Sequence, residues 1–195
     1  MEPRRFAHGA CAAGHSIKGS AAKNGGPRQH CLRCGRCCTR FGVCVTPSDI
    51  VRIAKCSGMK AEEFLSLVND YAEREREEPA VLIDGRMKIV VLKRKKENFC
   101  CFYSGEGCKI YKWRPYLCRA YPFIFRIGKL VEAGSRACIR RWEPEGKEKG
   151  KYYRDAKIYA KQVEEYKKVA KEWNSAGGGD SHSFLKFALQ RIKKR

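Results

Sequence analysis

The stretch that decides the fold is HCLRCGRCCTRFGVC, residues 30–44, in which five of fifteen residues are cysteine. Four of these five lie between Cys31 and Cys38, and the whole chain of 195 residues contains 12 cysteines. Clusters of this density occur in disulfide-bonded scaffolds, in metal sites and in catalytic thiol sites. The rest of the sequence must decide among these three.

The N-terminal sequence argues against a secreted, disulfide-bonded protein. Residues 1–20 contain no apolar run long enough for the core of a signal peptide, and no later stretch approaches the length of a membrane span. We therefore expect a cytoplasmic protein without a membrane span. Thiols are usually reduced in that compartment, although heat-loving organisms do keep intracellular disulfides, so clustered cysteine favours metal binding.

The composition adds a strong positive charge. Lys and Arg outnumber Asp and Glu by 42 to 21, a formal net charge of +21. This charge favours anionic partners such as nucleic acid, anionic lipid headgroups or acidic proteins, although it would also serve solubility alone. The hydrophobic fraction of 43% includes the cysteines. Because metal-bound thiolates are ligands more than packing residues, we expect metal to supply part of the stability.

The chain divides by composition into a disordered basic tail at 1–30, a metal-binding domain at 31–142 and a basic helical extension at 143–195. Residues 147–195 contain no cysteine and hold 14 basic against 6 acidic side chains, a net charge of +8. Weak binding of nucleic acid or an acidic protein is therefore expected of the C-terminal helices. The expected fold class is α+β, a small cysteine-rich, metal-centred domain with short helices and β-hairpins, plus a C-terminal helical extension.

Two short helices are expected after the cysteine-rich stretch. The first runs from Pro47 to Gly58, because Thr46 is suited to cap its N-terminus and glycine to end it. The second lies within residues 60–79, where apolar residues recur at steps of three and four until Pro79. Its apolar residues are Phe64, Leu65, Val68, Tyr71 and Ala72.

Two hairpins and two further helices complete the expectation. Asp84-Gly85 is a strong two-residue hairpin signal, and FIFRIGKLVEAG predicts a second hairpin that turns near Gly128. A long helix is expected through Ile158, Val163, Tyr166, Val169 and Trp173, followed by a glycine hinge at 177–179 and a short basic helix capped by Ser181.

The cysteine spacing favours metal in chemical terms. Cys31-x2-Cys34 lets two thiolates reach one ion, and Cys37 extends the pattern to the opening of a ferredoxin-type cluster loop. The distant fourth thiolate of such a loop would be Cys118, which prolines flank. Cys38 departs from the ferredoxin pattern, and adjacent side chains point in different directions, so either Cys37 and Cys38 serve different ions or one of them supports a ligand without binding the ion itself. Two neighbouring four-thiolate sites would need eight cysteines, and the chain has them.

Three stretches, in order, resemble a known family: CLRCGRCC, then VTPSDIVRIA, then CCFYSGEGCKIYKWRPYLCRAYPF with a trailing Cys138. They resemble the YkgJ-type cysteine-cluster family, the CxxCxxCC domain to which zinc or iron chelation is attributed. The resemblance covers residues 31–142 and implies one ligand set of eight cysteines: Cys31, Cys34, Cys37, Cys38, Cys100, Cys108, Cys118 and Cys138.

Four cysteines fall outside the family's pattern: Cys11, Cys44, Cys56 and Cys101. Cys56 lies near the end of its expected helix and is interpreted as a small buried residue. Tyr103 stands where the family usually has leucine.

The expected function is that of a metal-binding protein with one or two centres and a structural or redox role. Zinc needs only tetrahedral thiolates, whereas an iron-sulfur cluster suits the cysteine triplet with a remote fourth ligand, and we favour the cluster. A zinc-stabilised nucleic-acid-binding protein is the first alternative. A methyltransferase-like enzyme is the second, because the flagellin lysine N-methylases of the resembled family are linked to such a cluster.

The sequence offers little support for catalysis. No Gly-x-Gly loop follows a strand, and no Ser/His/Asp or Cys/His set can be assembled, so no catalytic residue is expected. Arg114 and Arg119 flank Cys118 and are candidates either to offset thiolate charge or to form surface ion pairs. The aromatic residues around them could stack on nucleobases, but we expect them to build the core: Tyr111, Trp113, Tyr116, Tyr121 and Phe123.

Overall fold

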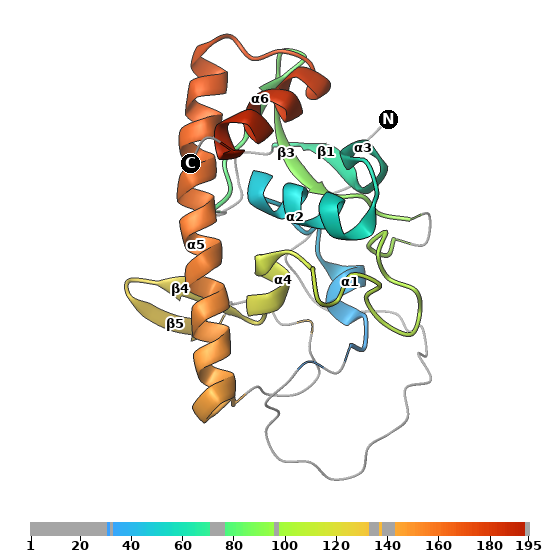
Figure 1. Ribbon diagram of the computed structural model, residues 1–195, viewed down its shortest axis with the longest axis vertical. Helices are drawn as coiled ribbons and strands as arrows, with labels where there is room; N and C mark the ends of the chain where they lie inside the picture. Colours follow the sequence, from blue (N-terminus) through green and yellow to red (C-terminus); the bar gives the residue numbers. More distant parts are fainter. Residues whose placement is uncertain are drawn as a thin grey trace.

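The computed structural model describes residues 31, 33–70, 77–95, 98–132, 137 and 143–193. The expected tail at 1–30 and two of the cysteines, Cys11 and Cys138, lie outside the described residues. The fold class is α+β, as predicted: helices alternate with two small antiparallel sheets (Figure 1).

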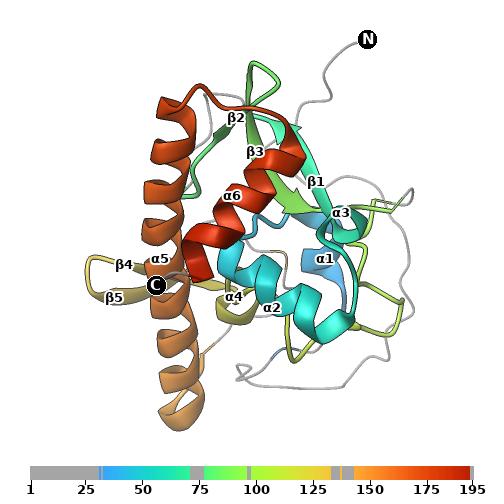
Figure 2. The ribbon, with the colours of Figure 1, turned by 45° about the horizontal axis from the view of Figure 1, so that its top comes forward.

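The larger sheet has three strands in the order β1-β3-β2. They are β1 (Leu65–Asn69), β2 (Val81–Ile83) and β3 (Arg86–Leu92), and both neighbours of β3 run antiparallel to it. Helices α2 (Pro47–Ser57), α5 (Gly146–Ser175) and α6 (Ser181–Lys193) lie on the same side of this sheet (Figure 2). The second sheet, β4 (Phe123–Arg126) with β5 (Lys129–Glu132), projects beside α5.

Helix α2 begins and ends where the sequence predicts. The Thr46 hydroxyl accepts a hydrogen bond from the Asp49 N–H at 3.2 Å, and the Asp49 carboxylate accepts one from the Thr46 N–H at 3.4 Å. This reciprocal pair is a capping box, which satisfies two donors that the first helical turn leaves without partners. Gly58 ends the helix with a φ of 72°, a left-handed conformation that glycine adopts at little cost.

The predicted helix within residues 60–79 is wrong for most of its described part. Only α3 (Ala61–Phe64) is helical, and the chain then becomes strand β1. Five residues of β1 pair with β3, from Leu65 opposite Leu92 to Asn69 opposite Lys88. The edge of β3 supplies partners for this backbone, and that tertiary pairing outweighs a local apolar spacing which also fits a helix. Residues 71–76 lie outside the described part.

Both predicted hairpins are confirmed, and they share one turn geometry. Asp84 and Gly85 have φ values of 48° and 70°, and Ile127 and Gly128 have values of 46° and 72°. Two consecutive positive φ angles match the right-handed twist of the flanking strands. Asp84 and Gly85 join β2 to β3, and the second pair joins β4 to β5.

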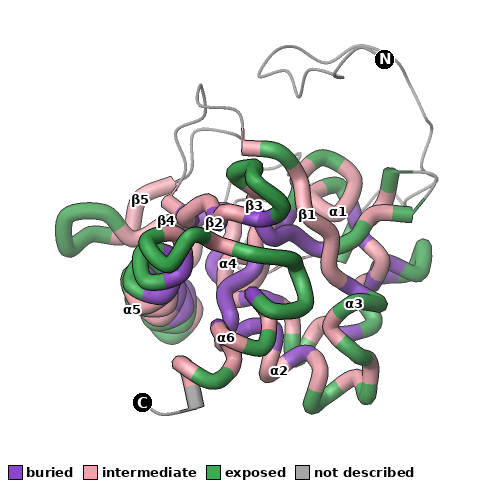
Figure 3. The backbone as a smooth tube through the Cα atoms, turned by 90° about the horizontal axis from the view of Figure 1, so that it is seen from above, coloured by how far each residue is buried: buried purple, intermediate pink, exposed green. Residues whose placement is uncertain are grey.

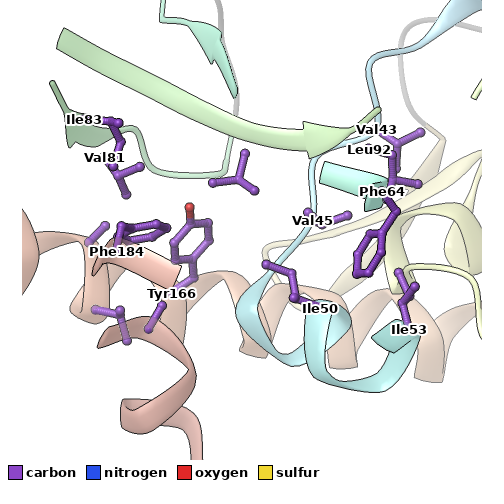
Figure 4. Packing of buried hydrophobic residues seen from close by; sticks show 14 of the residues in the cluster. Val43, Val45, Ile50, Ile53, Phe64, Val81, Ile83, Leu92, Tyr166 and Phe184 are labelled. Atoms are coloured by element: carbon purple, nitrogen blue, oxygen red, sulfur yellow. The ribbon is translucent and has the colours of Figure 1, made fainter. Parts of the chain in front are cut away.

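The two C-terminal helices contribute to the main core. Seen end-on in Figure 3, α5 has its buried residues on the side facing the rest of the chain. Figure 4 shows Tyr166 and Phe184 from these helices beneath the larger sheet, with Val45 and Ile50 nearby. The long helix is therefore confirmed. The predicted cap of α6 is wrong, because the Asp180 carboxylate, and not Ser181, accepts the N–H groups of His182 and Ser183 at 2.9 and 3.0 Å.

The aromatic residues expected to build the core divide between core and surface. Phe123 is buried, as predicted, whereas Tyr111, Tyr116 and Tyr121 are half-buried. Trp113 is 38% exposed, so the expectation is wrong for this residue. Across the described residues, no helix has both the length and the apolar character that a membrane span requires.

Candidate metal centre

The Cys31-x2-Cys34 segment forms a tight turn. The Arg33 N–H donates to the Cys31 sulfur at 3.3 Å, and Arg33 and Gly35 have φ values of 57° and 74°. An N–H donated to sulfur favours the thiolate, which is the form that binds metal. Helix α1 (Arg36–Arg40) follows at once and carries Cys37 and Cys38.

Tyr103 packs directly on this turn. A side chain at position 35 would lie 2.3 Å from Cζ of the Tyr103 ring, closer than any side-chain carbon can approach. The Tyr103 hydroxyl donates to the Gly105 carbonyl at 2.8 Å, and Tyr103 forms an isolated β-bridge with Cys108. The loop that carries the second cysteine group therefore lies against the first group.

A backbone hydrogen bond joins the two cysteine groups. The N–H of Cys100 donates to the carbonyl of Cys38 at 2.9 Å. The neighbouring Cys101 thiol is instead within hydrogen-bonding distance of the Phe64 carbonyl, at 3.8 Å. Cys100 is buried and belongs to the main core, against which Cys38, Cys101 and Cys108 also pack.

Arg94 ties the two groups together from one side. Its guanidinium donates to the Phe41 carbonyl at 2.5 Å and to the Thr39 carbonyl, both just beyond Cys38. It also donates to the Asn98 carbonyl and, at 2.8 Å, to the Asn98 side-chain oxygen, just before Cys100. The sequence pattern does not single out Arg94, because this residue stands in a basic run that shows no spacing relationship to the cysteines.

Helix α4 (Tyr116–Ala120) brings Cys118 to the same place. The Tyr116 N–H donates to the Asp49 carboxylate of α2 at 3.2 Å, and Arg119 forms an ion pair with Asp155 of α5 at 3.3 Å. Arg119 thus forms the ordinary ion pair that was one of its two expected roles. Arg114 instead donates to the carbonyls of Tyr111 and Cys118, at 2.6 and 3.4 Å.

Four thiols influence one another electrostatically. Burial raises the pKa of the Cys118 thiol well above its usual value, and negative charge on Cys37, Cys100 and Cys108 raises this pKa further. Burial likewise raises the pKa of Cys108, to which Cys100 and Cys37 add. The structure therefore brings together thiols from α1, from the 100–108 loop and from α4.

The pKa values of the other two thiols, Cys37 and Cys100, shift in opposite directions. A hydrogen bond with Cys38, followed by burial, raises the pKa of Cys37. A hydrogen bond with Cys101 lowers the pKa of Cys100 to about 7, against the effect of its burial, and the Arg94 charge contributes in the same direction. Several buried thiols that resist ionisation beside one another are a donor set that a bound cation would stabilise as thiolates. This chemistry fits zinc or iron.

Two other predicted ligands, Cys31 and Cys34, have different surroundings from these four thiols. Cys31 packs against the small cluster of Phe123 and Tyr152, and Cys34 is exposed. Within the described ranges, no three His, Cys, Asp or Glu side chains are close enough to hold a metal ion as they stand.

Cys44 and Cys56, two described cysteines outside the predicted ligand set, lie in other parts of the fold. Cys44 forms an isolated β-bridge with Val91. Cys56 is exposed, which corrects the interpretation of it as a small buried residue. Cys56 occupies the penultimate position of α2, beyond the part of the helix that the core covers, whereas Ile53 one turn earlier is fully buried.

Residues 30–143 match the model of the CxxCxxCC family, whose description is "putative zinc- or iron-chelating domain". The chain belongs to this family. It is also 28% identical over 142 residues to the uncharacterized protein MJ0661 of Methanocaldococcus jannaschii, an alignment that covers 68% of each chain. No solved structure matches it.

Arg94 gives a testable prediction about the site. Arg94→Met removes the hydrogen bonds that hold the ends of the two cysteine groups together, so metal affinity is expected to fall about 10- to 100-fold, as when groups supporting metal ligands are removed. The measurement is the rate of metal transfer to a chromogenic chelator. Arg126→Met is the control, because Arg126 is exposed at the end of β4 and pairs with Glu77 rather than with a residue of the cysteine groups. Equal release from both variants would contradict the role of Arg94.

Proposed function

We propose that this protein binds iron or zinc through cysteine thiolates and that one centre is formed by Cys37, Cys100, Cys108 and Cys118. The observation that carries the proposal is the packing of the two cysteine groups on each other: the Cys100 N–H donates to the Cys38 carbonyl at 2.9 Å, and Cys108 and Cys118 pack against the same core as Cys100. Negative charge on Cys37, Cys100 and Cys108 also raises the pKa of Cys118, which supports one region for these thiols.

A second centre would use the other four cysteines of the proposed ligand set: Cys31, Cys34, Cys38 and Cys138. Ala137, the chain neighbour of Cys138, is buried, and its N–H donates to the Tyr121 hydroxyl at 2.5 Å. The Tyr121 ring lies 5.5 Å from that of Phe41, which follows α1 directly. These contacts join Ala137, through Tyr121, to the residue that follows α1, and Cys138 itself lies outside the described residues. Cys37 and Cys38 would then serve different centres.

We favour an iron-sulfur cluster in at least one centre, and zinc is the alternative. Both metals take four thiolates, and both would leave a net negative centre that Arg94 and Arg114 can offset. A bound cluster supplies one-electron redox chemistry, whereas zinc supplies only structure. A reducing compartment such as the cytoplasm would keep the thiols available for either.

Metal analysis of protein purified without oxygen tests the proposal. An iron-sulfur protein would be brown, would contain iron and acid-labile sulfide, and would lose visible absorption on reduction. A zinc protein would be colourless and contain stoichiometric zinc. Protein that contains neither metal, and whose thiols all react readily with a thiol reagent before and after chelation, would refute the proposal.

A further inference from the structure

The turn between Cys108 and α4 displays an aromatic side chain on a fixed backbone. The Trp113 side chain is 38% exposed, whereas the backbone N–H of this residue donates to the Ile110 carbonyl at 2.7 Å. Arg52 of α2 donates to the carbonyls of Trp113 and Arg114 at 3.5 and 3.0 Å. The indole is therefore held at the surface, and a ligand that contacts it would lose little affinity to the ordering of this turn.

Positive charge lies beside this indole and over the nearby ring of Tyr111. The Lys112 ammonium lies 5.0 Å from the centre of the Trp113 ring. The guanidinium groups of Arg33 and Arg114 lie 4.0 and 3.8 Å from the centre of the Tyr111 ring. Cation–π contacts hold these side chains in place without neutralising their charge. We call these five residues the aromatic-basic surface.

The neighbouring Tyr116 provides an internal comparison. Arg52 and Arg119 lie 4.4 and 4.6 Å from the centre of its ring, but each also forms an ion pair, with Asp49 and Asp155 respectively. In the described part of the chain, neither Arg33 nor Arg114 has such a carboxylate partner. The charge of Arg33 is thus not neutralised by a carboxylate of the described fold, whereas the charge around Tyr116 is.

The sequence on both sides adds to this charge. The segments RCGRCCTR, residues 33–40, and KIYKWR, residues 109–114, each contain three basic residues and no acidic one. The contact between Arg33 and Tyr111 brings the two segments together. Glu106, exposed on the adjoining loop, is an acidic neighbour.

We propose that the aromatic-basic surface binds single-stranded nucleic acid without sequence preference. A base would stack on Trp113, while Lys112 and Arg33 would contact phosphates on either side of it. Unpaired bases expose the π-faces that an indole can stack on, and every base has one, so stacking gives affinity without selectivity. An acidic protein would use the charge but leave the exposed indole unexplained. This inference goes beyond metal binding, because none of the five residues is a proposed ligand.

The test is fluorescence anisotropy with a labelled single-stranded oligonucleotide of about 12 nucleotides, within the usual range of site sizes. The full-length, metal-containing protein is titrated over a salt series. Trp113→Ala is expected to weaken binding about tenfold with little change in salt dependence. Lys112→Gln is expected to reduce the slope of log K against log salt by about 0.7, the value for one phosphate contact on a single strand. Glu106→Gln is expected to strengthen binding.

Matched controls lie elsewhere on the molecule. Met87→Ala removes a 41% exposed apolar side chain from β3, and Lys129→Gln removes an exposed charge from β5. Neither is expected to change binding more than twofold. The proposal is overturned if Trp113→Ala behaves like Met87→Ala, or if Lys129→Gln costs as much as Lys112→Gln. It is also overturned if polyglutamate competes as strongly as the oligonucleotide, which would identify an acidic-protein surface.

Discussion

Replacing Cys118 with serine is expected to release metal and to lower the melting temperature sharply. Cys118 is the residue of α4 whose thiol responds to Cys37, Cys100 and Cys108 together. Binding of a structural zinc contributes about 10–16 kcal/mol in small metal domains, and in such domains this is folding free energy. Loss of even a third of it, about 4 kcal/mol, would lower the melting temperature by about 8–16 °C in a chain of this size. Thermal unfolding and metal content measured on the same sample check the result.

Cys56→Ser is the control for this experiment. Cys56 is exposed at the end of α2, so its replacement is expected to change stability by no more than about 0.5 kcal/mol and to leave the metal content unchanged. A strong chelator should destabilise the wild-type protein in the same way as the Cys118 substitution. A protein that keeps its melting temperature under chelation but loses it under a reductant would contain disulfides, and the metal proposal would then be wrong.

Local sequence signals predict the elements that local interactions determine. The capping box of Thr46 and Asp49, the glycine that ends α2 and the Asp84-Gly85 turn all involve residues within a few positions of each other. Their hydrogen bonds and φ angles follow from residue type. The predictions for these elements are therefore confirmed.

Elements that distant partners determine are not predictable in this way. Strand β1 exists because β3 pairs with it, and the apolar spacing of Leu65 and Val68 fits a helix equally well. The predicted cap of α6 is wrong for a different, local reason. Asp180 and Ser181 are adjacent and are both good capping residues, so residue type does not choose between them.

The same distinction holds for the site. Cysteine type and spacing are enough to indicate a metal site, because both are local properties of the chain. They indicate Cys118 as a remote partner of Cys37, but not that Cys100 and Cys108 share a region with these two, nor that Arg94 bonds to both cysteine groups. Those relationships join chain segments that lie far apart in the sequence. They arise only when the chain folds.

Replacing Gly35 with alanine is expected to destabilise the protein by about 2–5 kcal/mol, from two separate causes. A left-handed residue other than glycine costs about 1–2 kcal/mol, and Gly35 has a φ of 74°. The added methyl group would also overlap the ring of Tyr103, which is buried and cannot move aside freely. Overpacking of this kind typically costs a further 1–3 kcal/mol, roughly. Because the turn carries Cys34 beside it, metal content should fall as well.

Gly58→Ala separates the two causes. Gly58 has a φ of 72°, nearly that of Gly35, but a methyl group there would meet nothing within 4 Å. It should therefore cost only the backbone term, about 1–2 kcal/mol, and leave the metal bound. Adding Tyr103→Leu to Gly35→Ala removes the ring atoms that the methyl group would strike, so the double variant should recover metal content relative to Gly35→Ala alone. If Gly35→Ala costs no more than Gly58→Ala, the packing of Tyr103 on the cysteine turn does not restrain it.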